Sequence, residues 1–320
     1  MSRAMTDHEI LIPHSYSAEA RETLAPRFNE LDGVTVVVTD TPDETLEAFE
    51  TATIALTPRL PDEWLDRAHA LEWAQATSAG YDHYDLDALE ESGIALTTAA
   101  GVHGQPIGEW VLGAMLGFER TLFEARERQR DGVWLRDGGG ELGSKTVGIV
   151  GLGAIGGRVA ELASAVGCDV IGTKRDPSTA PDAVDEAVPP AELDAVLHRS
   201  QYLVLACPLT DETRELIDAA AFETMPRDAV LVNVARGDVV DQDALVESLQ
   251  QGRIGGAALD VFSTEPLPSD SPLWDLPNVL VTPHVAGSTP RYYDRVAEIF
   301  RENYERFVAG DRDGMRNRVV

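Results

Sequence analysis

Three side chains able to carry acid–base and anion-binding chemistry, Arg236, Glu265 and His284, each follow a separate apolar run of the sequence. Arginine presents a planar, permanently charged fork that matches a carboxylate. A carboxylate beside an imidazole orients the ring and favours the protonated form that can donate a proton. Taken singly, each residue is compatible with a helix cap, a loop charge or a histidine satisfied at a strand end. Their joint placement predicts one site, where Arg236 holds a carboxylate and polarises a neighbouring carbonyl while Glu265 and His284 share a proton.

The segment VGIVGLGAIGGRV, residues 147–159, contains a glycine pattern typical of dinucleotide binding. Its G-x-G-x-x-G motif lies directly after a strand-like apolar run and directly before a helical pattern. The first glycine makes the tight turn, the second admits the pyrophosphate, and the third lets helix and strand pack closely. The helix N-terminus then offers N–H groups and partial positive charge to the phosphates. We therefore expect Gly151, Gly153, Ala154, Ile155 and Gly156 to contact a nicotinamide dinucleotide; a glycine turn without a ligand is the alternative.

The next strand-like run ends in Thr173, Lys174 and Arg175. Folds of this kind usually carry a carboxylate here, which binds the ribose 2′-hydroxyl. A carboxylate would repel a 2′-phosphate, whereas Lys174 and Arg175 could pair with it. We expect these three residues to contact the cofactor, with NADP(H) preferred and NAD(H) also accepted. In the alternative, Lys174 and Arg175 form an exposed turn and Asp176 holds the ribose.

The elements that must position these residues form two alternating α/β patterns. The first has expected strands at 9–12, 34–39, 53–56, 71–76 and 94–97, with helices at 18–31 and 62–70. One long helix is expected at 107–130. The second has expected strands at 146–150, 169–173, 202–206, 229–233, 256–260 and 279–282, with helices at 155–166 and 242–251. A last helix, 291–309, follows the second sheet and is expected to return to the first domain.

The composition is strongly acidic, with 55 acidic and 26 basic residues, a net charge of −29, and only two lysines, Lys145 and Lys174. The acidic residues are dispersed along the chain. Such a coat resembles that of halophilic proteins, which work in molar salt, where the Debye length is about 3 Å; a merely acidic protein is the alternative. The lack of a basic patch disfavours nucleic acid as a partner.

The sequence shows neither a targeting segment nor a paired-cysteine motif. No apolar run reaches the roughly 18 residues of a membrane span, and the first residues lack the apolar run of a signal peptide. Cys168 and Cys207 are far apart and belong to no C-x-x-C pair. We therefore expect a cytoplasmic protein with no membrane association, no disulfide framework and no metal site.

Over nearly its whole length the sequence resembles the D-isomer-specific 2-hydroxyacid dehydrogenase family. The motifs that carry the resemblance are GLGAIG at Gly151, CPLTDETREL at Cys207, NVARGDVVD at Asn233, ALDVFSTEPLP at Ala258 and TPHVAGST at Thr282. The fold class implied is α/β, with two Rossmann-type doubly wound parallel-sheet domains. Residues 1–101 plus 288–320 are expected to form a discontinuous, flavodoxin-like substrate (catalytic) domain, and residues 102–287 the dinucleotide-binding domain.

The resemblance also implies roles for residues that match family positions. Arg236 would bind the substrate carboxylate, and Glu265 with His284 would supply the proton. The substrate carboxylate would also meet the backbone of Ser78, Ala79, Gly80 and Tyr81. Asp260 would contact the nicotinamide carboxamide, and the cofactor would further be lined by Cys207, Pro208, Val234, Ala235, Arg236, His284, Ala286 and Gly287.

The activity implied is reduction of a small 2-keto acid to a D-2-hydroxy acid by hydride transfer from NAD(P)H, in a homodimer. Two departures from the family pattern matter. The acidic ribose position is Lys174, and Glu265 replaces the glutamine of the formate dehydrogenase branch, which disfavours formate oxidation. The alternatives are a non-catalytic, dinucleotide-sensing protein like the corepressors that share this fold, and a phosphoglycerate-type dehydrogenase.

Overall fold

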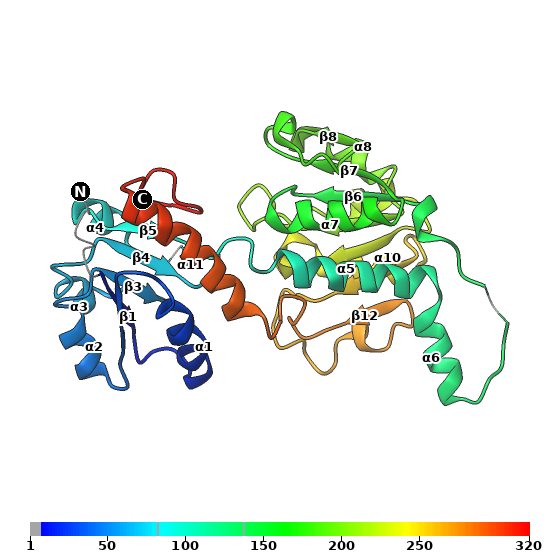
Figure 1. Ribbon diagram of the computed structural model, residues 1–320. Helices are drawn as coiled ribbons and strands as arrows, with labels where there is room; N and C mark the ends of the chain where they lie inside the picture. Colours follow the sequence, from blue (N-terminus) through cyan, green and yellow to red (C-terminus); the bar gives the residue numbers. More distant parts are fainter. Residues whose placement is uncertain (1–7, 82, 137) are drawn as a thin grey trace. The chain divides into compact units, whose positions relative to one another are not determined.

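The computed structural model describes residues 8–81, 83–136 and 138–320. The chain divides into two compact units, coloured along the sequence in Figure 1. Unit 1 comprises Met1–Val102 and Thr289–Val320, and unit 2 comprises His103–Ser288. Each point where the chain passes from one unit to the other lies one residue later than expected from the sequence. Because the last helix belongs to unit 1, this unit is discontinuous.

Unit 1 is built on a five-stranded parallel sheet with the strand order β2-β1-β3-β4-β5. This is the flavodoxin-like order, so the predicted fold class is confirmed for this unit. The elements are β1 (His8–Ile12), α1 (Ala18–Phe28), β2 (Val34–Val38), α2 (Pro42–Ala48), β3 (Ile54–Thr57), α3 (Asp62–Leu65), β4 (Trp73–Ala76), α4 (Leu86–Glu91), β5 (Ala95–Thr97) and α11 (Tyr292–Ala309).

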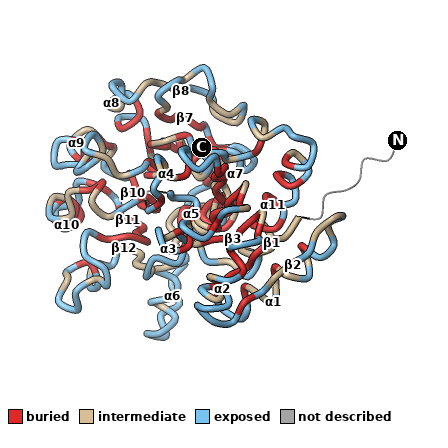
Figure 2. Tube along the Cα trace, turned by 90° about the vertical axis from the view of Figure 1, so that its left-hand side faces the viewer, coloured by how far each residue is buried: buried red, intermediate tan, exposed pale blue. Residues whose placement is uncertain are grey.

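Both faces of this sheet are covered, as a parallel sheet requires. On one face Trp73 stacks on Phe300 of α11, with 4.7 Å between ring centroids, and Phe300 stacks on Phe28 of α1 at 4.2 Å. On the other face Leu11 and Ala74 pack with α2, α3 and α4. The buried residues of the tube in Figure 2 accordingly concentrate in the strands. The predicted return of the last helix to the first domain is confirmed.

Unit 2 is built on a seven-stranded parallel sheet with the order β12-β11-β10-β9-β6-β7-β8. Counted within the unit, this is the Rossmann order 3-2-1-4-5-6 with one further strand, so the connections reverse direction between β6 and β9. The elements are α5 (Gly104–Glu119), α6 (Leu122–Arg130), β6 (Thr146–Val150), α7 (Ala154–Ala165), β7 (Asp169–Thr173), β8 (Glu186–Val188), α8 (Leu193–Leu197), β9 (Tyr202–Leu205), α9 (Ala219–Thr224), β10 (Val230–Asn233), α10 (Gln242–Gln250), β11 (Gly256–Leu259) and β12 (Val279–Val281).

The prediction of one long helix over 107–130 is wrong. The helix breaks between α5 and α6, where Thr121 adopts a left-handed conformation with φ 52°. The break lets the Phe123 ring fold back onto α5, where it meets Phe118 edge-on with 5.1 Å between centroids. It fills the space where a side chain on Gly117 would lie, since a Cβ there would be 2.3 Å from the ring. Helical periodicity continues through the break and therefore did not reveal it.

Candidate active site and dinucleotide turn

The glycine turn after β6 lies at the point where the connections of the unit 2 sheet reverse. Gly151 has φ +95°, a conformation that L residues with side chains rarely adopt. A Cβ on Gly151 would stand 2.8 Å from Cys207 Cα and 2.9 Å from Cys207 N, in the segment that follows β9. The turn is therefore pressed against the end of the neighbouring strand, in the crevice where open α/β sheets bind ligands.

The other two glycines give the turn the shape of a phosphate cradle. Gly153 precedes α7 without a side-chain cap, and a Cβ there would meet nothing within 4 Å. A Cβ on Gly156 would lie 2.1 Å from the carbonyl oxygen of Gly151, so only glycine lets α7 pack on the turn. The first N–H groups of the helix have no acceptor within it and face this open space. The residues present fit a dinucleotide pyrophosphate.

Thr173 positions this turn from the end of β7. Its hydroxyl accepts a hydrogen bond from the Gly151 N–H at 3.2 Å, and its carbonyl oxygen accepts one from the Leu152 N–H at 3.1 Å. The residue is buried. Its expected contact with the cofactor stays a prediction, but its contribution to the turn is visible in the structure.

Past β7, the side chains of Lys174, Arg175 and Asp176 differ in the hydrogen bonds that they make. Asp176 accepts hydrogen bonds from the Ser178 N–H at 3.1 Å and the Ser178 hydroxyl at 2.6 Å. These bonds, with the nearby Lys174 charge, lower the pKa of Asp176. Lys174 Nζ donates to the Thr179 carbonyl oxygen at 2.5 Å. Arg175 is exposed and its side chain has no hydrogen bond or ion pair among the described residues.

Arg236 lies in a short loop that Asn233 holds in place, a role that the sequence did not lead us to expect. Asn233, the buried last residue of β10, accepts a hydrogen bond from the Ala235 N–H at 3.0 Å and donates to the Arg236 carbonyl oxygen at 3.1 Å. Arg236 itself is exposed, and its guanidinium donates to the Ala235 carbonyl oxygen at 2.6 Å. An amide residue at the end of an apolar strand, just before V-A-R-G, is the signal that could have found this role.

The loop after β10 is pressed onto the loop after β11. A Cβ on Gly237 would stand 1.8 Å from the carbonyl carbon of Phe262, so glycine is required for this approach. The contact brings the Arg236 loop beside Glu265, which lies three residues past Phe262. The charge of Arg236 contributes to lowering the pKa of Glu265.

Glu265 and His284 form the pair expected from the sequence. Glu265 Oε2 lies 2.8 Å from His284 Nδ1, and Glu265 Oε1 accepts a hydrogen bond from the Phe262 N–H at 3.0 Å. Burial favours the neutral acid, but the hydrogen bonds from His284 and Phe262 and the charges of His284 and Arg236 outweigh it. The pKa of Glu265 is lowered below its ordinary value. An ionised carboxylate thus fixes Nδ1 of the imidazole, and Nε2 is the atom that could exchange a proton with a ligand.

Asp260 holds the loop that carries His284. Its buried carboxylate accepts hydrogen bonds from the Val285 N–H at 2.9 Å, the Ala286 N–H at 2.8 Å and the Thr282 hydroxyl. His284 adopts a left-handed backbone conformation, φ 55°, and its N–H donates to the Asp260 carbonyl oxygen at 2.8 Å. Asp260 therefore shapes the turn that aims the imidazole, while its expected contact with the nicotinamide stays a prediction.

The remaining expected cofactor residues of unit 2 follow β9, β10 and β12. Cys207, Val234, Ala235 and Ala286 are buried, and Pro208 is exposed. Burial raises the pKa of the Cys207 thiol. The Gly287 carbonyl oxygen lies 3.2 Å from His103 Nδ1 at the start of α5. Because the strands are parallel, these residues stand at the same edge of the sheet as the glycine turn and the Glu265–His284 pair.

Unit 1 carries the segment expected to meet the substrate carboxylate, in the loop after β4. The Ser78 hydroxyl donates to the Gly80 carbonyl oxygen at 2.7 Å, and the Ser78 carbonyl oxygen accepts from the Ala99 N–H at 2.9 Å. Ala79, Gly80 and Tyr81 are exposed. The loop is thus anchored at its first residue and presents backbone to solvent beyond it; its role in substrate binding stays a prediction.

The described residues form neither a metal-binding cluster nor a membrane-crossing helix. Within them no group of three or more histidine, cysteine, aspartate or glutamate residues is arranged to hold a metal ion. None of the helices that the structure describes has both the length and the apolar character of a membrane-crossing segment.

The family model, the curated relatives and the solved structures that resemble this chain all point to one family. Residues 112–286 match the family model "D-isomer specific 2-hydroxyacid dehydrogenase, NAD binding domain". Glyoxylate/hydroxypyruvate reductase B of Pectobacterium carotovorum is 38% identical over 239 residues, 72% of this chain and 74% of that protein. Glyoxylate reductase of Thermofilum pendens is 35% identical over 262 residues, 80% of this chain and 77% of that protein. A probable 2-hydroxyacid dehydrogenase from Rhizobium etli, solved with NADP, superposes with a TM-score of 0.79 at 27% identity and 98% coverage of both chains. The chain belongs to the D-isomer specific 2-hydroxyacid dehydrogenase family.

Proposed function

We propose that Arg236, Glu265 and His284 are the residues with which this NAD(P)-dependent 2-hydroxyacid dehydrogenase reduces 2-keto acids to D-2-hydroxy acids. The observation that carries this assignment is the 2.8 Å contact between Glu265 Oε2 and His284 Nδ1. It joins a carboxylate whose lowered pKa keeps it ionised to an imidazole whose other nitrogen remains available. Both groups lie at the same sheet edge as the glycine turn.

Each of the three residues has one task in the proposed reduction. A reduced dinucleotide held by the Gly151–Gly156 turn would supply a hydride to C2 of the keto acid. The Arg236 guanidinium binds the substrate carboxylate through its planar fork. His284 donates the Nε2 proton to the keto oxygen, and Glu265 stabilises the imidazolium and fixes its orientation. The names of the relatives make glyoxylate and hydroxypyruvate the first substrates to assay. The backbone of Ser78–Tyr81 is the proposed second contact of the substrate carboxylate.

The test replaces His284 with asparagine, because asparagine tolerates the left-handed backbone found at this position better than alanine does. We expect kcat to fall by about 10² to 10⁴ while the Kd for NAD(P)H changes little. The matched control is His198→Asn, at an exposed histidine of the same unit. Wild-type turnover by the His284 variant would refute the assignment. A wild-type protein that binds NAD(P)H but turns over no 2-keto acid would favour the non-catalytic, dinucleotide-sensing alternative.

We also propose that NADP(H) is preferred over NAD(H), with both accepted. Asp176, the carboxylate that could bind a ribose 2′-hydroxyl, is engaged by Ser178, whereas the Arg175 guanidinium is exposed and has no partner in the described part of the chain. A charge-assisted bond to a 2′-phosphate contributes about 1.5–3 kcal/mol, or about 10- to 100-fold in affinity. We expect Arg175→Ala to lower kcat/KM for NADPH by that factor and to leave NADH nearly unchanged. A wild-type preference for NADH would contradict the proposal, and loss of NADH activity in Asp176→Ala would favour the alternative.

A homodimer is the proposed assembly, formed through α6 and the segment that follows it. Among the described residues α6 has no buried member, and it extends away from the sheet of unit 2 (Figures 1 and 2). Leu122, Val133, Trp134 and Leu135 are more than half exposed, Trp134 at 91%. Exposed apolar residues grouped in one segment, as at 133–135, mark interaction sites. Light scattering should give a dimer that Trp134→Ser weakens and the matched Trp274→Ser does not; a monomeric wild type would contradict this.

The acidic surface supports a further proposal, a halophilic enzyme that works in the cytoplasm. With a net charge of −29, self-repulsion opposes folding until salt screens it. Both cysteines are free and buried, as in proteins kept in a reducing compartment. Activity and Tm should rise between about 0.1 and 3 M KCl, because the Debye length falls from about 10 Å to a few ångströms. Flat profiles across this range would contradict salt adaptation.

A further inference from the structure

The loop after β4 begins at Thr77, a buried residue whose two oxygen atoms are each bonded to a tyrosine. The Thr77 carbonyl oxygen accepts a hydrogen bond from the hydroxyl of Tyr292, the first residue of α11. The Thr77 hydroxyl lies 3.0 Å from the hydroxyl of Tyr16, a buried residue in the loop after β1. The next residue is Ser78, the first of the segment expected to meet the substrate carboxylate.

The bond from Tyr292 fixes the direction of the Ser78 N–H. The Thr77 carbonyl and the Ser78 N–H belong to one planar trans peptide, so they point in opposite directions. Because the carbonyl points at the Tyr292 hydroxyl, the N–H points away from it. A hydrogen bond to a carbonyl oxygen also polarises the peptide and strengthens its N–H as a donor. Tyr292 therefore aims and strengthens a donor that it does not touch.

The carbonyl groups that follow in this loop are held in the same way. The Ser78 carbonyl oxygen accepts a hydrogen bond from the Ala99 N–H at 2.9 Å, and the Gly80 carbonyl oxygen accepts one from the Ser78 hydroxyl at 2.7 Å. The N–H groups of residues 78–81, in contrast, have no acceptor among the described residues. Successive backbone N–H groups can bind an anion between them. The loop is thus a set of available donors whose directions are set from the carbonyl side.

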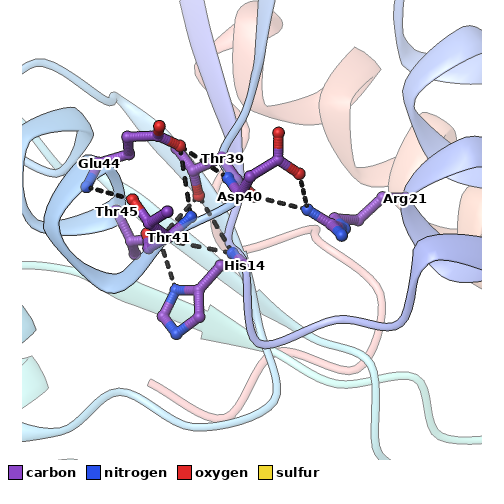
Figure 3. Close-up of polar contacts among 7 residues, drawn as sticks. All are labelled: His14, Arg21, Thr39, Asp40, Thr41, Glu44 and Thr45. Atoms are coloured by element: carbon purple, nitrogen blue, oxygen red, sulfur yellow. Dashed lines mark hydrogen bonds and ion pairs between the residues drawn. The ribbon is translucent and has the colours of Figure 1, made fainter.

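The loop that carries Tyr16 is fixed by the polar cluster drawn in Figure 3. Two residues before Tyr16, the His14 N–H donates to the Thr39 hydroxyl at 3.1 Å, and His14 Nδ1 lies 2.7 Å from the Thr45 hydroxyl. The Tyr16 N–H donates to the Pro13 carbonyl oxygen at 3.2 Å, which closes the turn. The Tyr16 hydroxyl therefore has a fixed place from which to bind the Thr77 side chain.

Helix α11 gives Tyr292 an equally fixed place. The helix packs on the sheet through the buried side chains of Val296 and Phe300, about one and two turns after Tyr292, and Tyr292 packs against the same cluster. Burial raises the pKa of Tyr16 and of Tyr292 above the ordinary value. Both hydroxyls therefore remain protonated, and Tyr292 keeps the proton that it donates to the Thr77 carbonyl oxygen.

We propose that Tyr292 and Tyr16 are positioning residues for the substrate, because they hold the peptide whose Ser78 N–H binds one oxygen of the keto acid carboxylate. Neither tyrosine touches the substrate itself. The inference rests on the proposed function, since it takes the Ser78–Tyr81 backbone as a contact of that carboxylate. Without the Tyr292 hydroxyl the buried Thr77 carbonyl oxygen lacks a donor, and the peptide is free to turn toward another one.

The experiment removes one hydroxyl at a time. The KM and kcat for glyoxylate, the KM for NAD(P)H and the Tm are measured for wild type, Tyr292→Phe and Tyr16→Phe. Two controls lie on the same helix α11. Tyr293→Phe removes a hydroxyl that has no hydrogen-bond partner among the described residues. Tyr304→Phe removes a hydroxyl that donates to the Asp32 carbonyl oxygen at 2.9 Å, further along the helix.

Tyr292→Phe should raise the KM for glyoxylate by about 2- to 10-fold, the value of one neutral hydrogen bond. Its kcat should change little, because the carboxylate contact is the same in the ground state and in the transition state. Tyr16→Phe should act in the same direction, and the KM for NAD(P)H should stay at the wild-type value in both variants. Tyr293→Phe should behave as wild type, and Tyr304→Phe should lower Tm without raising the KM for glyoxylate.

Two results of these assays would overturn the inference. An unchanged KM for glyoxylate in Tyr292→Phe or in Tyr16→Phe would remove that tyrosine from the proposed role. An equal rise of this KM in Tyr304→Phe would show that the effect follows from a general loss of stability and not from the direction of the Ser78 N–H.

Binding of oxamate separates failure of this inference from failure of the proposed function. Oxamate carries a carboxylate beside an amide carbonyl, so titration calorimetry with the cofactor-loaded protein requires no turnover. A Kd weakened about twofold or more by Tyr292→Phe, and not by Tyr293→Phe, supports the inference. A Kd that Tyr292→Phe leaves unchanged while Arg236→Ala weakens it overturns the inference and leaves the proposed function standing. A wild type that neither binds oxamate nor turns over glyoxylate would count against the proposed function, and the inference would fall with it.

Discussion

Glu265→Gln changes the Glu265–His284 pair by one charge while keeping its size. The Phe262 N–H can still donate to the glutamine carbonyl oxygen, as it does to Glu265 Oε1 at 3.0 Å. The amide nitrogen would then face His284 Nδ1 in place of the carboxylate oxygen now 2.8 Å away. The ring keeps a hydrogen-bond partner and loses the negative charge beside it.

The size of the loss follows from the distance and the exposure of the two groups. Two unit charges about 4 Å apart interact by about 1 kcal/mol in water and about 4 kcal/mol at an effective dielectric constant of 20. The side chains of His284 and Glu265 are 55% and 36% exposed, so solvent screens much of the attraction. We therefore take about 1–2 kcal/mol, which predicts a fall in kcat/KM of about 5- to 30-fold.

The assay is the pH profile of kcat/KM for keto acid reduction, measured for wild type and variant. The expected fall in kcat/KM should appear at pH values where Glu265 is ionised in wild type, above its lowered pKa. The control is Glu186→Gln, which removes a carboxylate from a surface ion pair with Arg199 at 2.6 Å in the same unit. A variant with the wild-type kcat/KM at these pH values would refute the electrostatic role of Glu265.

The acid side of the same profile tests the ionisation of Glu265. Hydrogen bonds and neighbouring charges outweigh burial and lower the pKa of this carboxyl below its ordinary value of 4.5. The pair therefore stays intact above that value and is lost only as pH falls through the lower folded-state pKa, taking its contribution to stability with it. The acid limb of wild type should lie below pH 4.5 and be absent from Glu265→Gln. An acid limb well above this value would contradict the assignment.

Further predictions concern the supports of the site. Gly156→Ala places a Cβ 2.1 Å from the Gly151 carbonyl oxygen, and should lower the free energy of unfolding by about 1–3 kcal/mol and weaken NAD(P)H binding. Urea denaturation measures the stability and fluorescence titration measures the cofactor Kd. The control is Gly113→Ala, at an exposed position of α5 where a Cβ would meet nothing within 4 Å, and its free energy of unfolding should rise by about 0.5–1 kcal/mol. Equal effects of the two substitutions would contradict the packing argument. Asp260→Asn leaves one buried N–H of the loop 282–286 without an acceptor, so kcat should fall at least about tenfold for a loss of about 1–3 kcal/mol. Unchanged kcat would show that the loop does not depend on this carboxylate.

Local sequence signals were sufficient for the dinucleotide turn and for most of the strands. Gly151, Gly153 and Gly156 act within six residues of one another, and the strand before them and the helix after them follow directly. The strands 146–150 and 169–173 were predicted with the bounds the structure shows, because buried parallel strands are continuous apolar runs. β8 (Glu186–Val188) was missed, since it is a three-residue edge strand without a fully buried residue and so lacks that signal.

The sequence by itself determined which residue types stand beyond which strands, and therefore predicted Arg236, Glu265 and His284 as one site. Only the tertiary structure decided how they are held. Thr173 binds the Gly151 turn across 22 positions, and Asp260 binds the loop of His284 across 22 to 26, contacts that no local periodicity encodes. Such contacts form only when parallel strands place distant loops at one edge, because hydrogen bonds and ion pairs depend on distance in space and not along the chain.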